Sequence, residues 1–500
     1  MFGKSSLILL TGLFSVISNA FPVFERSGSS PSDFLVGELP GFDLIPDIVK
    51  PVMYAGHLEL YASNNTNYFF WKFERPQLNV SSDNSIENLH SNLLVFWLNG
   101  GPGCSSMDGA LMELGPLRVA IDGSVVYNEG SWSEAADVVF VDQPGGTGFS
   151  YTDVDDPNLT FITYDFMIFL QKYFEVFPDD FEKDIYIAGE SYGGQYIPRA
   201  AYEILQQNKL PDPIYGQEIN LKGILIGNGW IAPNLQSLSY LPFGLEVGVI
   251  SKGNLLLPSL VEQHNKCKES IRNPPAADDM EFPECVFVLD SFLNITLDTD
   301  APEDQQCINV YDYELRDSYP ACGANWPNIL EGTTDFLRRS DVQKALNLKK
   351  PIQWVECSDP VYEDLYPTKE EESYKLLPEI LSEIPIVLFN GALDIICNTL
   401  STEMLIENMK WDDHRGFTKD AERMHWIYDG EKAGEIVSQS NLTFIKVYNA
   451  SHMVPYDVPE VSRGLVDIIT NKYKKIAGDI VDYIYTPVYD IYEGEYHYDE

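Results

Sequence analysis

The chain has 500 residues, of which 44% are hydrophobic and 22% are charged, a composition that predicts a globular protein with a sizeable core. Its 76 acidic and 33 basic residues give a formal net charge of −43 at pH 7. This excess of acid argues against nucleic acid as a partner, because phosphate backbones attract basic surfaces. Most of the acidic side chains are expected on a solvated surface, which suits a protein that stays soluble in a mildly acidic compartment.

The N-terminus has the pattern of a secretory signal peptide over residues 1–20. Lys4 supplies a short positive region, residues 7–17 are apolar, and Ser18, Asn19 and Ala20 form a small-x-small cleavage site with the cut expected after Ala20. The apolar run is too short to span a bilayer, and a buried N-terminal helix is the alternative. Later stretches of about 18 apolar residues do not occur, so we expect no transmembrane anchor in this chain.

Cysteines and glycosylation sequons also indicate the secretory pathway. A secreted chain with seven cysteines is expected to hold disulfides and one odd thiol. Four of the cysteines gather in one stretch, and their pairing is open: Cys267, Cys285, Cys307 and Cys322. Six N-x-Ser/Thr sequons predict a glycosylated protein. Their asparagines are Asn64, Asn79, Asn158, Asn294, Asn441 and Asn449.

Short apolar runs recur along the chain, most of them ending in a polar loop rich in Gly or Asn. The first pair, residues 54–60 and 68–73, alternates well enough for a hairpin. The later runs are 93–98, 138–141, 185–188, 223–226, 385–389 and 444–448. Helical segments are expected between some of them, including 161–177 and 195–207. The pattern predicts a mostly parallel sheet flanked by helices, with functional loops at the carboxyl ends of the strands.

The strand rhythm stops between residues 230 and 335, a stretch rich in Pro, Asp and Cys. We therefore predict an α/β fold whose core is interrupted by a helical, disulfide-rich insertion or cap. The expected divisions after the signal are an N-terminal segment (21–51), a first core segment (52–229), the insertion (230–335), a second core segment (336–475) and an acidic, Tyr-rich tail (476–500). The composition of the tail predicts disorder.

The stretch GESYG contains Gly-x-Ser-x-Gly and places Ser191 between a predicted strand and a predicted helix, as a nucleophile elbow requires. A serine hydroxyl needs a histidine base oriented by an acid, and in an α/β-hydrolase fold these follow in the order serine, acid, histidine. Asp394 follows the run 385–389, and His452 follows the run 444–448. Ser191, Asp394 and His452 are therefore the predicted triad. The alternatives are an incidental motif and a structural loop histidine.

Five blocks along the chain resemble the signature motifs of the serine carboxypeptidases. They are WLNGGPGCSS (97–106), DQPGGTGFSY (142–151), GESYGGQYIP (189–198), NGALDIICN (390–398) and NASHMVPYDVP (449–459). The resemblance spans roughly residues 52–470. The variant SSMDGALMELGP (105–116) is most similar to the fungal pheromone-processing branch, whose members trim C-terminal Lys and Arg after a dibasic-cutting endoprotease.

This resemblance implies an α/β-hydrolase fold and a serine-type carboxypeptidase with the triad named above. It implies an oxyanion hole made by the backbone amides of Gly101 and Tyr192, and no metal or cofactor. Substrates would be peptides or proteins with free C-termini, while the oligomeric state is open. The implied binders of the substrate's terminal carboxylate are Asn99, Glu113 and Glu190. The implied cysteine roles are a disulfide between Cys104 and Cys357 and a free thiol at Cys397.

Glu190 directly precedes the nucleophile, where an anion should oppose the charge that grows on the attacked carbonyl. Two carboxyl groups close together cannot both stay ionised, so one keeps its proton to higher pH. A protonated Glu190 or Glu113 would donate a hydrogen bond to the substrate's carboxylate, and peptide hydrolysis would be best at acidic pH. The alternative for Glu113 is a surface helix residue.

Asp108, nine positions after Asn99, is the predicted determinant of specificity. An acid in the pocket for the substrate's last residue would favour Lys or Arg by pairing with it. Met453, next to His452, is expected to line the same pocket against the aliphatic stem. The alternative for Asp108 is a cap on a helix that begins near Gly109.

Other functions and compartments stay open at this point. A broad-specificity vacuolar or secreted carboxypeptidase, or an esterase or acyltransferase, would use the same triad. A non-catalytic partner of another glycoprotein would be expected to lack a triad residue. The secretory lumen is the expected location, with the trans-Golgi implied by the resemblance. Because similar fungal proteins continue into an acidic stretch and a membrane anchor and this sequence stops at an acidic tail, a vacuolar or secreted enzyme is the alternative.

Overall fold

The computed structural model describes residues 28–45, 50–76, 92–154, 157–213, 215–274, 280–366 and 370–470. The predicted signal peptide, the sequon at Asn79 and the predicted tail lie outside these residues. Across the described ranges, every helix is too short or too polar to cross a membrane.

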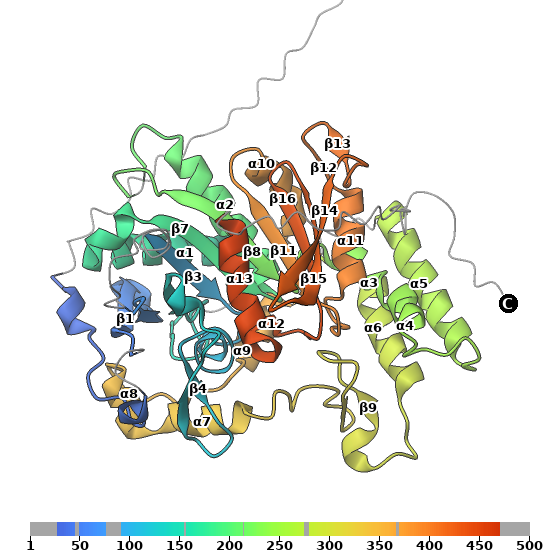
Figure 1. Cartoon of the computed structure of the whole chain (residues 1–500), viewed down its shortest axis with the longest axis horizontal. Coiled ribbons are helices and arrows are strands. Elements are labelled where there is room, and N and C mark those ends of the chain that lie inside the picture. The colour runs from blue at the N-terminus through green and yellow to red at the C-terminus, as the bar shows by residue number, and fades with distance from the viewer. Residues whose placement is uncertain are drawn as a thin grey trace, which may run out of the picture.

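A ten-stranded sheet forms the centre of the molecule (Figure 1). Its strands are β1 (Met53–Tyr61), β2 (Thr66–Phe73), β3 (Leu93–Leu98), β6 (Asp137–Val141), β7 (Asp184–Glu190), β8 (Leu221–Gly227), β11 (Ile386–Gly391), β14 (Glu422–Tyr428), β15 (Glu431–Gln439) and β16 (Leu442–Val447). The spatial order is β1-β2-β6-β3-β7-β8-β11-β16-β15-β14. The central strands from β6 to β16 run parallel, and the strands at both edges are antiparallel. Every strand expected from an apolar run is present.

The sheet is buried on both faces, which explains why its central strands read as continuous apolar runs. In β3, Leu94, Phe96 and Leu98 enter one hydrophobic core, while Val95 and Trp97 enter the other. The first core packs against α1 (Leu159–Val176), α2 (Gly193–Asn208), α9 (Asp359–Leu365), α10 (Leu377–Leu381) and α11 (Thr399–Asn408). The second packs against η6 (Gly109–Glu113), α7 (Leu330–Arg338), α8 (Ser340–Ala345), α12 (Val454–Asp457) and α13 (Pro459–Ile469).

Between β8 and α7 the chain leaves the sheet and forms a group of helices beside α11 (Figure 1). These are α3 (Pro233–Ser237), α4 (Tyr240–Glu246), α5 (Leu257–Arg272) and α6 (Pro283–Thr296), followed by the short ribbon β9 (Cys307–Ile308) and β10 (Arg316–Asp317). The open cysteine pairing is resolved here: Cys267 bonds Cys285, joining α5 to α6, and Cys307 bonds Cys322.

The apolar runs did not reveal the edge hairpin of β14 and β15, because its side chains are only partly buried and alternate poorly. The signal that could have found it is the turn Asp429-Gly430, where both residues adopt the positive φ of a tight hairpin turn (47° and 82°). Two further small hairpins also escaped prediction: β4 (Leu117–Val119) with β5 (Val125–Tyr127), and β12 (Lys410–Trp411) with β13 (His414–Arg415).

Gly189→Ala tests how tightly the strands that carry the active-site loops are packed. A Cβ at this position would lie 2.0 Å from the backbone oxygen of Leu98 on the neighbouring strand β3, so the strands would have to separate. We expect a loss of more than about 3 kcal/mol in the free energy of unfolding, measured by urea denaturation. The matched control is Gly37→Ala, where nothing lies within 4 Å of the added atom. Equal stability of the two variants would contradict the packing described.

Candidate active site

Ser191 sits on a sharp turn between β7 and α2. Its backbone φ is 57°, a left-handed conformation that a non-glycine residue adopts at a cost and that is typical of a nucleophile elbow. The turn is held from both sides, because the Ser191 amide donates to Gly227 O (3.1 Å) and Ser191 O accepts from the Trp230 amide (2.7 Å). The fold thus presents the hydroxyl at the carboxyl end of the central strands.

Asp394 and His452 meet on the same rim of the sheet, after β11 and β16. His452 Nδ1 lies 2.8 Å from Asp394 Oδ2, and both side chains are buried, at 4% and 0% exposure. The amides of Ile396 and Cys397 also donate to the Asp394 carboxylate (3.0 and 3.2 Å). An aspartate held in this way orients the imidazole and stabilises its charged form. Ser191 and His452 line one cavity.

Asn228 is a positioning residue that the sequence analysis missed. It follows β8, and its side-chain amide donates to Asp394 Oδ2 at 2.7 Å. Its side-chain oxygen accepts from the Gly391 amide at 3.1 Å. Asn228 therefore ties the β8 loop to the β11 loop beneath the catalytic acid. The signal was the Gly-Asn-Gly sequence at the end of a predicted strand, which was interpreted as one loop among several.

The two amides implied as an oxyanion hole come from loops that touch. A Cβ built on Gly100 would lie 2.3 Å from the backbone nitrogen of Tyr192 and 2.9 Å from Ser191 Cβ, so only glycine allows this approach. Gly101 follows with a φ of 108°, in the region that favours glycine. Tyr192 is the N-cap of α2, so its amide lies at the positive end of that helix. Donors in this position suit an oxyanion that forms next to Ser191.

Asn99, Glu113 and Glu190 form one buried cluster beside Ser191. The Asn99 side-chain amide donates to Glu113 Oε1 (3.1 Å) and to Glu190 Oε1 (3.0 Å). The opposite end of the same amide accepts from Trp97 Nε1 (2.7 Å) and the Gly109 amide (3.2 Å), which fixes its orientation. Glu113 is fully buried in η6, so it is not the surface helix residue considered as an alternative.

The two carboxyl groups of this cluster cannot both be charged. Burial raises the pKa of Glu190 well above its usual range, and the neighbouring Glu113 raises it further. The pKa of Glu113 is also raised by burial, although hydrogen bonds from Asn99 and Glu190 oppose that shift. The upward shift is stronger at Glu190, so Glu190 keeps its proton to higher pH than Glu113, and the neighbouring pair holds one proton in common.

A cavity of about 400 Å³ opens over these groups. Its lining includes Asn99, Gly101, Asp108, Glu190, Ser191, Glu356, Asp359, His452 and Met453. Asp108 and Met453 thus reach the same space, as expected from the sequence. Asp108 makes no capping hydrogen bond although it precedes η6, and its Oδ1 is buried without a hydrogen-bond partner. The capping interpretation of Asp108 is therefore wrong. Glu356, which sequence reasoning did not single out, is a further acid of the lining, besides Asp108, Glu190 and Asp359.

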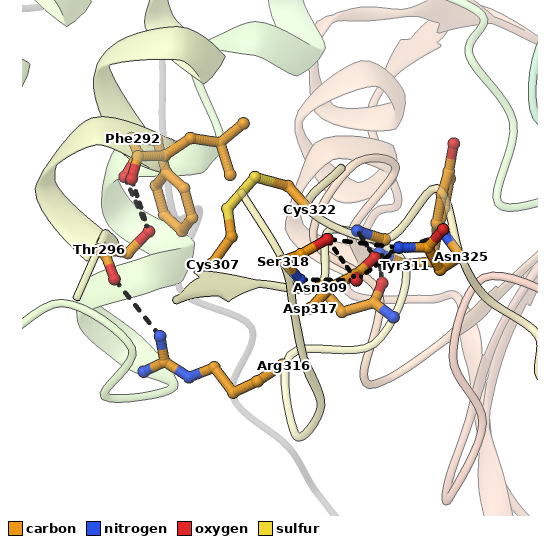
Figure 2. The surroundings of a disulfide bond; sticks show 12 residues. Phe292, Thr296, Cys307, Asn309, Tyr311, Arg316, Asp317, Ser318, Cys322 and Asn325 are labelled. Carbon is orange, nitrogen blue, oxygen red and sulfur yellow. Dashed lines mark hydrogen bonds between the residues drawn. A yellow bond between two sulfur atoms is a disulfide. The ribbon is translucent and has the colours of Figure 1, made fainter. Parts of the chain in front are cut away.

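Disulfides hold two of the loops around the cavity. The implied pair Cys104 and Cys357 is bonded and joins the Gly-rich loop after β3 to the segment before α9. Figure 2 shows the bond between Cys307 and Cys322 beside Asn309 and Tyr311. Tyr311 O accepts from the His452 amide at 3.0 Å, and the rings of these two residues lie 5.0 Å apart. This disulfide loop therefore supports the catalytic histidine.

Cys397 is the free cysteine and is buried. Burial and the nearby Asp394 carboxylate raise the pKa of its thiol well above the usual range. The thiol therefore stays protonated and is a poor nucleophile. Asp394, Cys397 and His452 bring potential metal-ligand atoms within 4.8 Å of one another. Asp394 and His452 already form a hydrogen bond with each other as acid and base, which leaves them poorly placed to share a cation.

The described sequon asparagines lie at or near the surface. Asn158, Asn294, Asn441 and Asn449 are exposed, and Asn64 is partly buried. Asn158 also caps α1, accepting from the Phe161 amide at 2.8 Å. Exposure makes these positions accessible to glycosylation, which stays a prediction.

Comparison with known proteins places the chain in a family. The model of the family described as serine carboxypeptidase matches residues 40–472, so the chain belongs to the serine carboxypeptidase family and is a serine-type carboxypeptidase. A relative named pheromone-processing carboxypeptidase KEX1 from Ogataea parapolymorpha is 50% identical over 463 residues, covering 92% of this chain and 73% of the relative. The protein of the same name from Debaryomyces hansenii is 46% identical over 473 residues, covering 93% and 68%.

A solved structure agrees with these relatives. The crystal structure of a prohormone-processing carboxypeptidase from Saccharomyces cerevisiae superposes with a TM-score of 0.84 at 40% identity. The match covers 90% of this chain and 98% of that one. The predicted α/β-hydrolase fold is thereby confirmed.

The shared proton of Glu113 and Glu190 predicts a pH-dependent stability. A carboxyl group whose folded pKa is raised stabilises the fold fully below its ordinary pKa of 4.5, and this contribution is lost as pH rises through the raised value. Glu190→Gln keeps a neutral donor at all pH values. We therefore expect its melting temperature, relative to wild type, to increase steadily from acidic to alkaline pH.

The measurement is thermal unfolding of both proteins across that pH range. Glu363→Gln, an exposed residue on α9, is the matched control and should follow wild type throughout. A difference between Glu190→Gln and wild type that does not change with pH would contradict a shared proton.

Proposed function

We propose that the protein removes single residues from the C-termini of peptides, as its carboxypeptidase relatives' name suggests, and that it prefers Lys and Arg because the acid Asp108 lines the cavity. The observation that carries the exopeptidase role is the buried Asn99, Glu113 and Glu190 cluster one residue from the nucleophile. When a free carboxylate enters, a protonated Glu190 and the Asn99 amide each exchange a hydrogen bond within the cluster for one to that carboxylate. An internal peptide bond offers no carboxylate there, so chain ends are selected.

In the proposed mechanism, the peptide's terminal carboxylate rests on Asn99 and Glu190, which places the last peptide bond over Ser191. His452 takes the proton of the Ser191 hydroxyl as the oxygen attacks the carbonyl carbon, and Asp394 stabilises the imidazolium. The amides of Gly101 and Tyr192 bind the oxyanion. His452 then gives its proton to the leaving amino group, and water, activated by the same histidine, hydrolyses the acyl-enzyme.

This mechanism works best in acid, because ionisation of Glu190 replaces a hydrogen-bond donor by a charge that repels the substrate's carboxylate. An esterase or acyltransferase would share the triad but would have no need for a buried carboxylate-binding cluster, so this alternative is not favoured.

The proposed site of action is the lumen of the secretory pathway, most specifically the trans-Golgi. The signal-like residues 1–20 and the exposed sequon asparagines support the luminal location, and the relatives' pheromone-processing name supports a processing compartment. We also propose the divisions at residues 52–229, 230–335 and 336–475 as the first core segment, the insertion and the second core segment.

Asp108→Asn tests the preference for basic residues. The variant removes the carboxyl group that ionises against a bound cation, so kcat/KM should fall about 10- to 100-fold for peptides that end in Lys or Arg, because a partly desolvated ion pair is lost. Peptides that end in Leu should change by less than about threefold, since they never used the charge. The measurement is kcat/KM on a panel of peptides that differ only in the last residue.

The matched control is Asp364→Asn, an exposed residue of α9 outside the cavity lining, which should change none of these values. Labelling of Ser191 with a fluorophosphonate before each assay gives the concentration of intact active sites. Equal losses on Lys, Arg and Leu peptides would reject Asp108 as the determinant.

A further inference from the structure

Glu356 lies in the cavity and has no role in the mechanism above. It stands in the segment between α8 and α9 and lines the cavity together with Asp108, Ser191 and Met453. Its side chain is partly buried, so some of it faces the open space of the cavity. Among the residues that the structure describes, neither Glu356 nor Asp108 is in an ion pair with a Lys or Arg.

The backbone around Glu356 is fixed against the loop that leads to Asp108. Glu356 O accepts from the Ser105 amide at 2.7 Å, and Ser105 O in turn accepts from the Asp108 amide at 3.2 Å. On the other side, the Ser358 amide donates to Gly103 O at 2.9 Å, and the Cys104–Cys357 disulfide closes the same contact. The backbone segments that carry the two acids are therefore tied together by hydrogen bonds and a disulfide.

Burial raises the pKa of both carboxyl groups, and Glu356 raises that of Asp108 further. Burial raises the pKa of Glu356 to about 7. The pKa of Asp108 is raised well above its usual range, first by burial and then by Glu356, Glu113 and Asp142. Among the described residues, His452 is the one basic side chain in the cavity lining, and it belongs to the triad. The Oδ1 of Asp108 is buried without a partner. The cation that pairs with the carboxyl groups of the lining must therefore come from a bound ligand.

We propose that Glu356 is a second specificity-determining residue, which completes with Asp108 a two-carboxylate clamp for the cationic end of the substrate's last residue. This inference rests on the proposed preference for basic residues. It adds that Arg and Lys differ in how strongly their binding depends on Glu356. A guanidinium carries several donors in a planar fork and can engage two carboxylates at once, whereas an ammonium is a compact point charge. Cleavage of peptides that end in Arg should therefore depend on Glu356 more than cleavage of peptides that end in Lys.

A purely structural role for Glu356 makes a different prediction. An acid just before the N-terminus of α9 interacts favourably with the helix dipole, and this would stabilise the loop whatever the substrate. Loss of that interaction would lower activity equally on all peptides. The split between Arg, Lys and Leu substrates therefore distinguishes a binding role from a structural one.

The experiment measures kcat/KM of wild type, Glu356→Gln and Glu363→Gln on three peptides that differ only in a C-terminal Arg, Lys or Leu. Glu363→Gln is the matched control, because it makes the same chemical change on an exposed residue outside the cavity. For Glu356→Gln we expect a loss of about tenfold or more on Arg, a smaller loss on Lys and less than about threefold on Leu. Glu363→Gln should match wild type on all three.

The outcomes separate the two proposals. A wild type that cleaves Leu as well as Arg and Lys would overturn the proposed preference itself. A wild type that prefers basic residues, combined with equal losses of Glu356→Gln on all three peptides, would overturn the role of Glu356 alone. Glu356→Asp covers a failure of the Gln variant to fold, since it keeps the charge on a shorter arm. It should retain its activity on Leu and lose most on Arg, and the same loss on Leu as on Arg would again reject the clamp.

Discussion

Glu113 and Glu190 are buried together against the side chain of Asn99, and the low polarity of their surroundings allows one negative charge between them. This constraint determines the charge and the hydrogen-bond donors that the active site offers. In the proposed mechanism, it places a hydrogen-bond donor where a second carboxylate would otherwise repel the substrate's end. It also explains how an acid can directly precede the proposed nucleophile, because Glu190 in its protonated form would not oppose an oxyanion at Ser191.

The sheet brings the residues of this cluster together, because its strands carry distant segments of the chain to one edge. Asn99 directly follows β3, β7 ends at Glu190, and β11 and β16 lead to Asp394 and His452. Parallel neighbours deliver their carboxyl ends to the same edge, so four loops far apart in the chain meet over one cavity. The disulfide loop at 307–322 and the Cys104–Cys357 bond then fix the segments that line the cavity but do not belong to the sheet.

The sequence predicted the central strands and the chain order of the triad, because buried parallel strands leave clear apolar runs and the elbow has a distinctive motif. It did not predict the hairpin of β14 and β15, whose partly buried side chains leave a weak pattern. The role of Asn228 was missed because it depends on a contact with Asp394, more than 160 positions away. The role of Glu356 was missed because it depends on a contact with the loop at Ser105, more than 240 positions away. Cysteine pairing likewise depends on tertiary proximity, which spacing does not encode.

The most direct test is the pH dependence of KM for two substrates with the same acyl group, a peptide with a free C-terminus and a methyl ester that lacks the carboxylate. The shared proton predicts that KM for the peptide rises from acidic to alkaline pH as Glu190 ionises, while KM for the ester stays nearly constant. A KM for the peptide that is flat over this range would contradict the account, because carboxylate recognition would then not depend on the proton held between Glu113 and Glu190.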